Sequence, residues 1–110
     1  MSIQQNSVSL FLEDIQASLE TPEIEGYLES LIIESDNKVE IIIESSLGYV
    51  VFSEKDFMGI RQFLPRQNIS AQGLTENLSF DKFLLNESLI ITVIGPKKTT
   101  VSFSIRYNSR

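Results

Sequence analysis

LIITVIGPKKTTVSFSIRY, residues 89–107, is the stretch that decides the fold class of this chain. Two runs rich in β-branched and apolar residues, 89–94 and 99–107, are separated by Gly95-Pro96 and two lysines. In the second run apolar and polar side chains alternate, which places the apolar ones on a single face of an extended strand. The pattern predicts an antiparallel pair of strands with one buried and one solvated face.

Two further strands are predicted upstream, at residues 39–44 and 49–52, with a turn at 45–48 between them. Three apolar residues of the first run alternate with Glu40 and Glu44. One face of this strand is therefore expected to belong to the core, and the other to lie mostly in solvent.

The segment between residues 67 and 79 contains Gly73 and many polar side chains, and it is predicted to be the longest loop. The apolar residues that follow, 80–85, fit a strand at the edge of the sheet.

Residues 7–20 fit an amphipathic helix. Ser7 is a suitable N-cap, and Thr21-Pro22 would end the helix because the residue before proline avoids the α region. The apolar residues recur at helical spacing, at Val8, Phe11, Leu12, Ile15 and Leu19.

Residues 53–64 fit a second helix. Ser53 would cap it, Asp56 would act as a shortened capping-box acid, and Pro65 would end it. Its inner stripe would be formed by Phe57, Ile60 and Leu64.

Residues 22–33 allow two interpretations. They fit a helix that begins at Thr21-Pro22. They also fit a hairpin in which residues 27–34 and 39–44 flank a turn at 35–38. We favour the hairpin, because the β-branched pair Ile32-Ile33 lies where a strand would enter the turn.

Together these elements predict an α+β fold, with a mainly antiparallel β-sheet of about five strands packed against one or two helices. With 110 residues, the chain has the usual size of a single domain, 1–110, in which residues 1–6 are expected to be flexible.

The chain contains no cysteine and no histidine. A disulfide framework and a thiolate zinc site are therefore excluded, as are a histidine general base and the Ser-His and Cys-His nucleophile pairs. No glycine-rich phosphate loop is present. We expect no enzymatic activity, no cofactor and no metal. The polar start and the absence of a long apolar run predict a cytoplasmic protein without a membrane segment.

The net charge of −6 is unevenly distributed. The first 37 residues carry eight acidic and no basic side chains. Such a cluster is either a solvated surface or a recognition surface that attracts a protein with a basic surface. The candidate partner-binding residues are Glu13, Asp14, Glu20, Glu23, Glu25 and Glu29.

The basic turn permits a different role. Lys97 and Lys98, supported by Arg106, are candidates for contacts with phosphate or with a second copy of the chain. Nucleic acid is disfavoured by the overall acidity, and a solubilising turn is the favoured interpretation of the two lysines. The uncharged face of the last strand, with Thr100, Ser102 and Ser104, also suggests a homodimer formed through that strand.

The expected function is therefore that of a non-enzymatic acidic binding protein, of the inhibitor, immunity or anti-defence type, which occludes or regulates a protein partner. The first alternative is a structural or assembly subunit that forms a homo-oligomer, in which the acidic third of one copy meets the basic turn of another. The second is a nucleic-acid binder that uses the turn at 95–98.

Overall fold

The computed structural model describes residues 2–70 and 78–109, and this part of the chain consists of β-strands and connecting turns without a helix. It accordingly has no helix that could cross a membrane. The predicted α+β class is wrong, because the described part is all-β. The strands are β1 (Ile3–Phe11), β2 (Gln16–Glu20), β3 (Ile24–Ser45), β4 (Val50–Phe63), β5 (Gln67–Ser70), β6 (Leu78–Asp81), β7 (Leu84–Glu87), β8 (Leu89–Ile94) and β9 (Thr100–Ser109).

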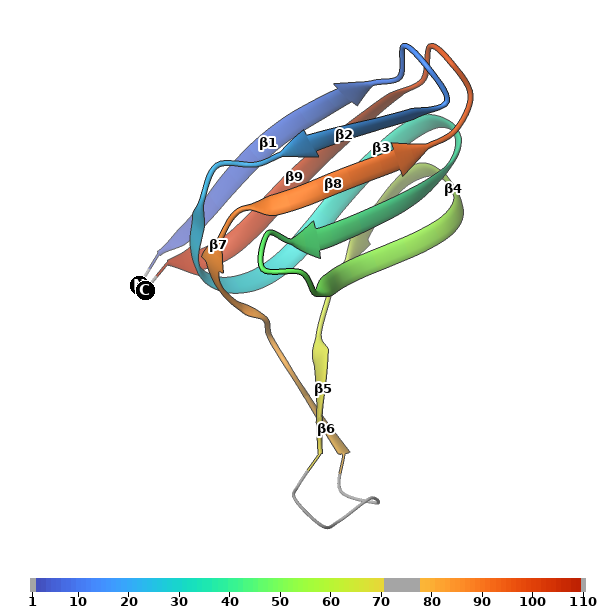
Figure 1. Cartoon of the computed structure of the whole chain (residues 1–110). Helices are drawn as coiled ribbons and strands as arrows, with labels where there is room; N and C mark the ends of the chain where they lie inside the picture. The colour runs from blue at the N-terminus through green and yellow to red at the C-terminus, as the bar shows by residue number, and fades with distance from the viewer. Residues whose placement is uncertain (1, 71–77, 110) are drawn as a thin grey trace.

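Seven strands form one antiparallel sheet that is folded over on itself (Figure 1). Its order is β1-β9-β3-β8-β2, and β4 and β7 also pair with β3. The long strand β3 connects the two layers, because residues 26–35 pair with β9 and residues 40–45 pair with β8. We call β2, β8 and residues 39–45 and 50–57 the β8 layer. We call β1, β9, β7 and residues 24–35 and 59–63 the β9 layer.

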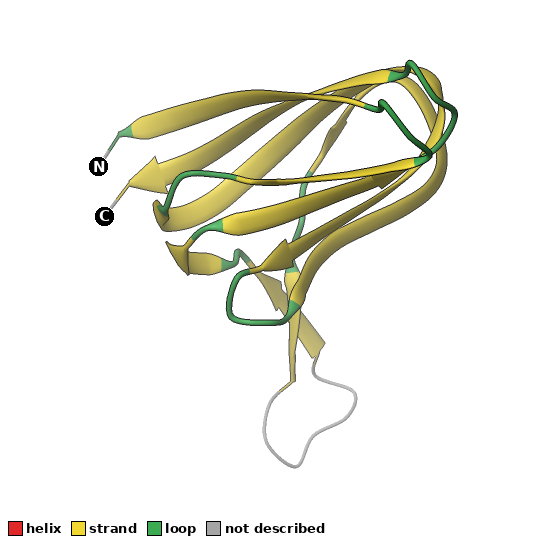
Figure 2. Cartoon of the chain, turned by 45° about the horizontal axis from the view of Figure 1, so that its top comes forward, coloured by secondary structure: helices red, strands yellow, loops and turns green. Residues whose placement is uncertain are grey.

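The core lies between these two layers (Figure 2). Alternate residues of each strand point into it, as the two-residue period of a strand requires. On β8 and β9 they are Leu89, Ile91, Val93, Val101, Phe103 and Ile105, and all are buried to 1% exposure or less. The strands predicted at 89–94 and 99–107, and the turn between them, are confirmed.

The predicted helix over residues 7–20 is wrong. These residues lie in β1, a turn and β2, and β1 pairs with β9 over its whole length, including residues 3–6. Only some of the apolar residues follow the period of two of the strands: Leu10 and Leu12 are buried, whereas Phe11 and Ile15, which belong to the helical stripe, are 52% and 62% exposed. Pairing with a central strand therefore determines the structure here, and local helical spacing does not.

The predicted helix over residues 53–64 is also wrong, because residues 53–63 lie in β4 and Leu64 lies in the connection that follows it. Phe57 is buried as expected, but Ile60 and Leu64 are 67% and 61% exposed. Asp56 and Gly59 adopt left-handed conformations, with φ of 55° and 96°, close to the places where the register between β3 and β4 shifts. These bulges bend the hairpin so that it follows both layers.

Residues 22–33 are extended, as the favoured interpretation requires, but the predicted hairpin turn at 35–38 is wrong. β3 bends there and continues. The Ser35 hydroxyl donates to the carbonyl of Asn37 at 2.6 Å and accepts from its amide at 3.3 Å. This local hydrogen bonding uses the turn-forming residues to bend one strand, at the place where β3 leaves β9 and joins β8.

The turn predicted at 45–48 is confirmed, and the strand predicted at 49–52 forms the beginning of β4. The predicted loop is only partly correct, since β5 and β6 pair with each other and extend away from the sheet in Figure 1. Its central residues, 71–77, including Gly73, lie outside the described residues. The edge strand predicted at 80–85 is divided between β6 and β7.

Candidate protein-interaction face

The structure does not gather the six acidic candidates on one surface. Glu13 and Asp14 lie in the turn between β1 and β2, next to the basic turn between β8 and β9 (Figure 1). Backbone hydrogen bonds join the two turns: the Lys98 amide donates to the carbonyl of Leu12 at 2.7 Å, and the Gly95 amide donates to that of Ile15 at 2.9 Å. Opposite charges that the sequence separates by more than eighty residues are thus neighbours at one end of the molecule.

The other acidic candidates lie away from this turn. Glu20 ends β2, Glu23 lies in the short connection to β3, and Glu25 is an exposed residue at the start of β3. Glu29 is partly buried and forms an ion pair with Lys82 in which Oε1 and Nζ are 2.7 Å apart. This pairing joins β3 to the segment before β7, so Glu29 has a structural partner within the chain.

A different set of side chains forms a coherent surface on the outer side of the β8 layer. Cross-strand pairs bring glutamates and isoleucines side by side: Glu40 faces Ile94, and Glu44 faces Ile90. On the other side of β8, Glu20 also faces Ile90. We call this surface the Ile–Glu face, and it consists of Glu20, Glu40, Ile42, Glu44, Ile90 and Ile94.

The orientation of the Ile–Glu face follows from strand alternation. Its neighbours in the sequence, such as Ile41, Ile43 and Ile91, are fully buried in the core. Residues between them must therefore point outward. The described residues form two layers, and no third layer covers the outer side of β8 (Figure 2). Ile42 and Ile90 consequently remain partly exposed.

Sequence reasoning assigned Glu40 and Glu44 to the solvent side, which is confirmed, but it missed the isoleucines beside them. The available signal was the uninterrupted apolar run at residues 41–43, together with a second run at 89–91. Such runs are typical of strands that are covered on both faces. In this chain the second face of these strands is open to solvent.

The charge on the β8 layer is predominantly negative. Its β2, β8 and β3 segments contain no lysine or arginine, and Lys55 is the only basic residue that the β4 segment adds. Apolar side chains continue past Glu44, because Val50 on β4 pairs with it and is 55% exposed. The surface therefore places partly exposed isoleucines and glutamates around a central Thr92, which is flanked by Ile42 and Ser18, an arrangement suited to a partner with apolar and basic groups.

A buried polar cluster supports the end of this layer. Glu87 is 7% exposed, and its Oε2 accepts hydrogen bonds from Ser45 Oγ at 2.7 Å and from the Tyr49 hydroxyl at 3.3 Å. Its Oε1 accepts from the Asn86 amide at 2.7 Å. The carboxylate of Glu87 is thus held by Ser45 and Tyr49 at the turn between β3 and β4 and by the neighbouring Asn86 of β7.

This cluster predicts a dependence of stability on alkaline pH. Desolvation by burial raises the pKa of Tyr49 above its usual value of about 10, and the negative Glu87 raises it further, although the Ser45 hydroxyl lowers it in part. A raised pKa in the folded state means that stability is complete below pH 10 and decreases as the pH rises through the folded pKa. We expect Tyr49→Phe to reduce this loss of stability at alkaline pH. The measurement is the thermal unfolding midpoint of both proteins from pH 8 to 11. An identical decrease in the variant would contradict the assignment.

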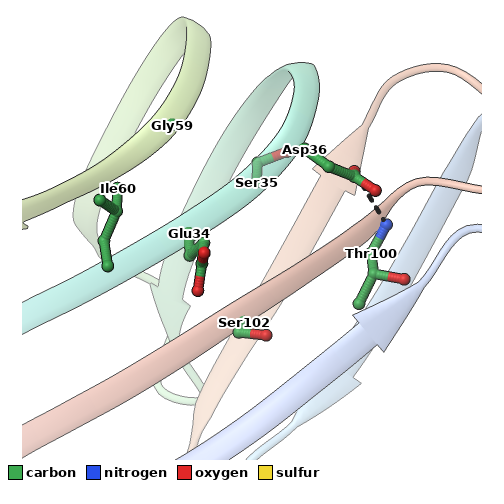
Figure 3. Close-up of a pocket in the computed structure, with 7 residues that line it drawn as sticks. All are labelled: Glu34, Ser35, Asp36, Gly59, Ile60, Thr100 and Ser102. Carbon is green, nitrogen blue, oxygen red and sulfur yellow. Dashed lines mark hydrogen bonds between the residues drawn. The ribbon is translucent and has the colours of Figure 1, made fainter.

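A hollow of about 330 Å³ lies on the β9 layer, beside the bend in β3 (Figure 3). Glu34 and Asp36 line it from β3, and Asp36 Oδ1 accepts from the Thr100 amide at 3.4 Å. The opposite wall carries the hydroxyls of Thr100 and Ser102. Both carboxylates project from one strand, two residues apart, so they do not face each other across the hollow.

The basic candidates are not brought together. Lys97 and Lys98 lie in the turn before β9, whereas Arg106 lies six residues beyond Thr100, the first residue of β9, and so about 20 Å from the start of the strand at 3.3 Å per residue. The predicted dimer through the last strand also lacks a free edge there, because β9 is paired on both sides, with β1 and with β3.

No protein-family model and no curated protein matches this chain. The described residues contain no group of three acidic side chains placed to hold a metal ion.

Proposed function

We propose that this chain is a non-enzymatic, cytoplasmic binding protein that covers a basic surface of a protein partner with its Ile–Glu face. The proposal includes a role of the inhibitor, immunity or anti-defence type, in which covering the partner's surface regulates it. The absence of histidine and cysteine from the chain supports a role without catalysis.

The observation that carries this proposal is the pairing of Glu40 with Ile94 and of Glu44 with Ile90 on an uncovered sheet face. Burial of the isoleucines against a partner would contribute about 25 cal/mol for each Å² of apolar surface removed from water. The carboxylates would accelerate association with a basic partner and select against acidic ones. Exposed apolar side chains bordered by polar and charged ones are common in protein interfaces.

The test is a charge reversal of the face. The triple variant Glu20→Lys, Glu40→Lys, Glu44→Lys is compared with Glu13→Lys, Glu25→Lys, Glu34→Lys, which has the same net charge but leaves the face intact. We expect the face variant to lose at least about ten-fold in capture of the partner from a lysate at low salt, because each exposed charge contributes up to about 1 kcal/mol. The control variant should retain capture. Captured proteins are quantified by mass spectrometry.

Two outcomes would contradict the proposal. Equal losses in both variants would show that capture depends on net charge alone. Unchanged capture by the face variant would show that these carboxylates do not contact the partner. Raising the salt concentration should weaken capture by the unmodified chain, because exposed charges are screened beyond about 8 Å at physiological ionic strength.

A further inference from the structure

β1 forms a long edge of the sheet without the features that usually protect such edges. It pairs with β9 over nine consecutive residues without a register shift. Its sequence, IQQNSVSLF, contains no charged residue and no proline. Among the described residues, no strand pairs with its other edge. A long, uncharged edge strand of this kind readily pairs with another strand.

The other edges of the sheet carry such protection. β2 is only five residues long, ends at Glu20 and is followed by Pro22. The outer edge of β4 carries Lys55 and Arg61, and its register against β3 is interrupted by shifts. Short length, charges and bulges all prevent edge-to-edge pairing. The contrast singles out β1 as the edge available for pairing.

The direction of the hydrogen bonds identifies the free backbone groups of β1. Leu12 donates to the carbonyl of Thr99 at 2.9 Å, and the carbonyl of Ser2 accepts from the Ser109 amide at 2.9 Å. Backbone groups of even-numbered residues therefore point towards β9 and its flanking turn. By the alternation of an antiparallel ladder, the odd-numbered residues point their amides and carbonyls away from β9. They are Ile3, Gln5, Ser7, Ser9 and Phe11.

We propose that two copies of this chain pair antiparallel through β1, about a two-fold axis at Ser7. In this register Ser7 faces Ser7 of the second copy, and Gln5 faces its Ser9. Ile3 and Phe11, which are 50% and 52% exposed, then face each other at both ends of the interface. Apolar side chains meet apolar ones, and polar meet polar, as a self-complementary two-fold interface requires.

The hydrogen-bonding pattern fits the same register. Each of the five odd-numbered residues supplies one free amide and one free carbonyl, and the pairing joins odd residues to odd residues. Two copies would therefore form about ten hydrogen bonds between chains. The interface uses the free edge of β1 in the β9 layer and leaves the Ile–Glu face of the β8 layer open. It is thus independent of the proposed function.

The absence of cysteine permits a direct test of the register with single-cysteine variants. In Ser7→Cys the two thiols would lie on facing residues, whose Cα atoms are about 5.5 Å apart in a hydrogen-bonded pair, within the range for a disulfide. In Ser9→Cys the two thiols would lie about 13 Å apart along the strands, because position 9 faces position 5. Ser18→Cys, an exposed serine on edge strand β2, is a second control.

We expect mild oxidation to convert Ser7→Cys into a covalent dimer, seen by intact mass and non-reducing electrophoresis, while Ser9→Cys and Ser18→Cys remain monomers. Equal cross-linking of all three variants would show random collision and overturn the proposal. So would a Ser7→Cys protein that remains monomeric while the unmodified chain sediments as a monomer at every concentration.

A proline variant tests the same edge without oxidation. Ser7→Pro removes an amide that points away from β9, so the fold should remain intact, which circular dichroism would verify. Because two central hydrogen bonds are lost, we expect dimer dissociation to increase at least about ten-fold in sedimentation equilibrium. Ser18→Pro should have no such effect. If the unmodified chain is a monomer but Ser7→Pro loses capture of another protein, the edge binds a foreign strand, and self-pairing is wrong.

Discussion

Replacement of Gly26 with alanine is expected to destabilise the fold by about 3 kcal/mol or more. Gly26 has a φ of 148°, which side-chain-bearing residues rarely adopt. A Cβ atom at this position would lie 2.2 Å from the carbonyl oxygen of Asn108. A small shift of the backbone cannot remove this clash, because Gly26 pairs with β7 on one side and with β9 on the other. The backbone on both sides would have to move.

Gly48→Ala is the matched control for this prediction. Gly48 also has a positive φ, of 105°, but a Cβ there would meet no atom within 4 Å. We expect Gly48→Ala to lower the free energy of unfolding only by the cost of placing a side chain at a positive φ, about 1–2 kcal/mol. Urea unfolding of both variants measures the two losses. Equal losses would show that the close approach of β3 to β9 at Gly26 does not exist.

The second large effect is expected at Ile91, which is fully buried between the two layers. Ile91→Ala removes three carbons from the core and should lower the free energy of unfolding by about 2–5 kcal/mol, since both the transfer of the side chain and the remaining cavity contribute. The measurement is again equilibrium unfolding in urea. This substitution tests whether β8 has its core side where the structure places it.

The neighbouring residue provides the comparison. Ile90 has the same side chain on the opposite face of β8, where it is partly exposed. Ile90→Ala should lower the free energy of unfolding by about 1 kcal/mol or less, because little cavity forms at a solvated face. A larger loss for Ile90→Ala than for Ile91→Ala would reverse the two faces of the strand and remove the Ile–Glu face from the molecular surface.

The sequence predicted strands most reliably where apolar residues alternate or run continuously. Residues 39–44, 89–94 and 99–107 are strands because their β-branched side chains fit a pleated, buried surface. The helices at 7–20 and 53–64 were mispredicted because their apolar residues form a helical stripe, whereas only some of them follow the period of two of the strands. Pairing with β9 and β3, which lie far away in the sequence, determines the outcome.

The candidate site was predicted less well than the fold. An acidic first third of the chain was evident, but strand geometry sends Glu13 and Glu25 to different parts of the surface and pairs Glu29 with Lys82. Of the six acidic candidate residues, only Glu20 belongs to the Ile–Glu face. The remaining glutamates of that face come from residues 40 and 44, which no local pattern connects to Glu20, because β8 lies between the two strands.

The most direct measurement of the central claim is site-specific photocross-linking from two positions on the same strand. A photoreactive amino acid at Ile42 reports on the Ile–Glu face, and one at Ile32 reports on the outer side of the β9 layer. Irradiation in a lysate should give a discrete adduct with a basic protein from position 42, and this adduct should disappear when Glu40 and Glu44 are changed to lysine. No adduct from position 42, or the same adduct from both positions, would contradict the account.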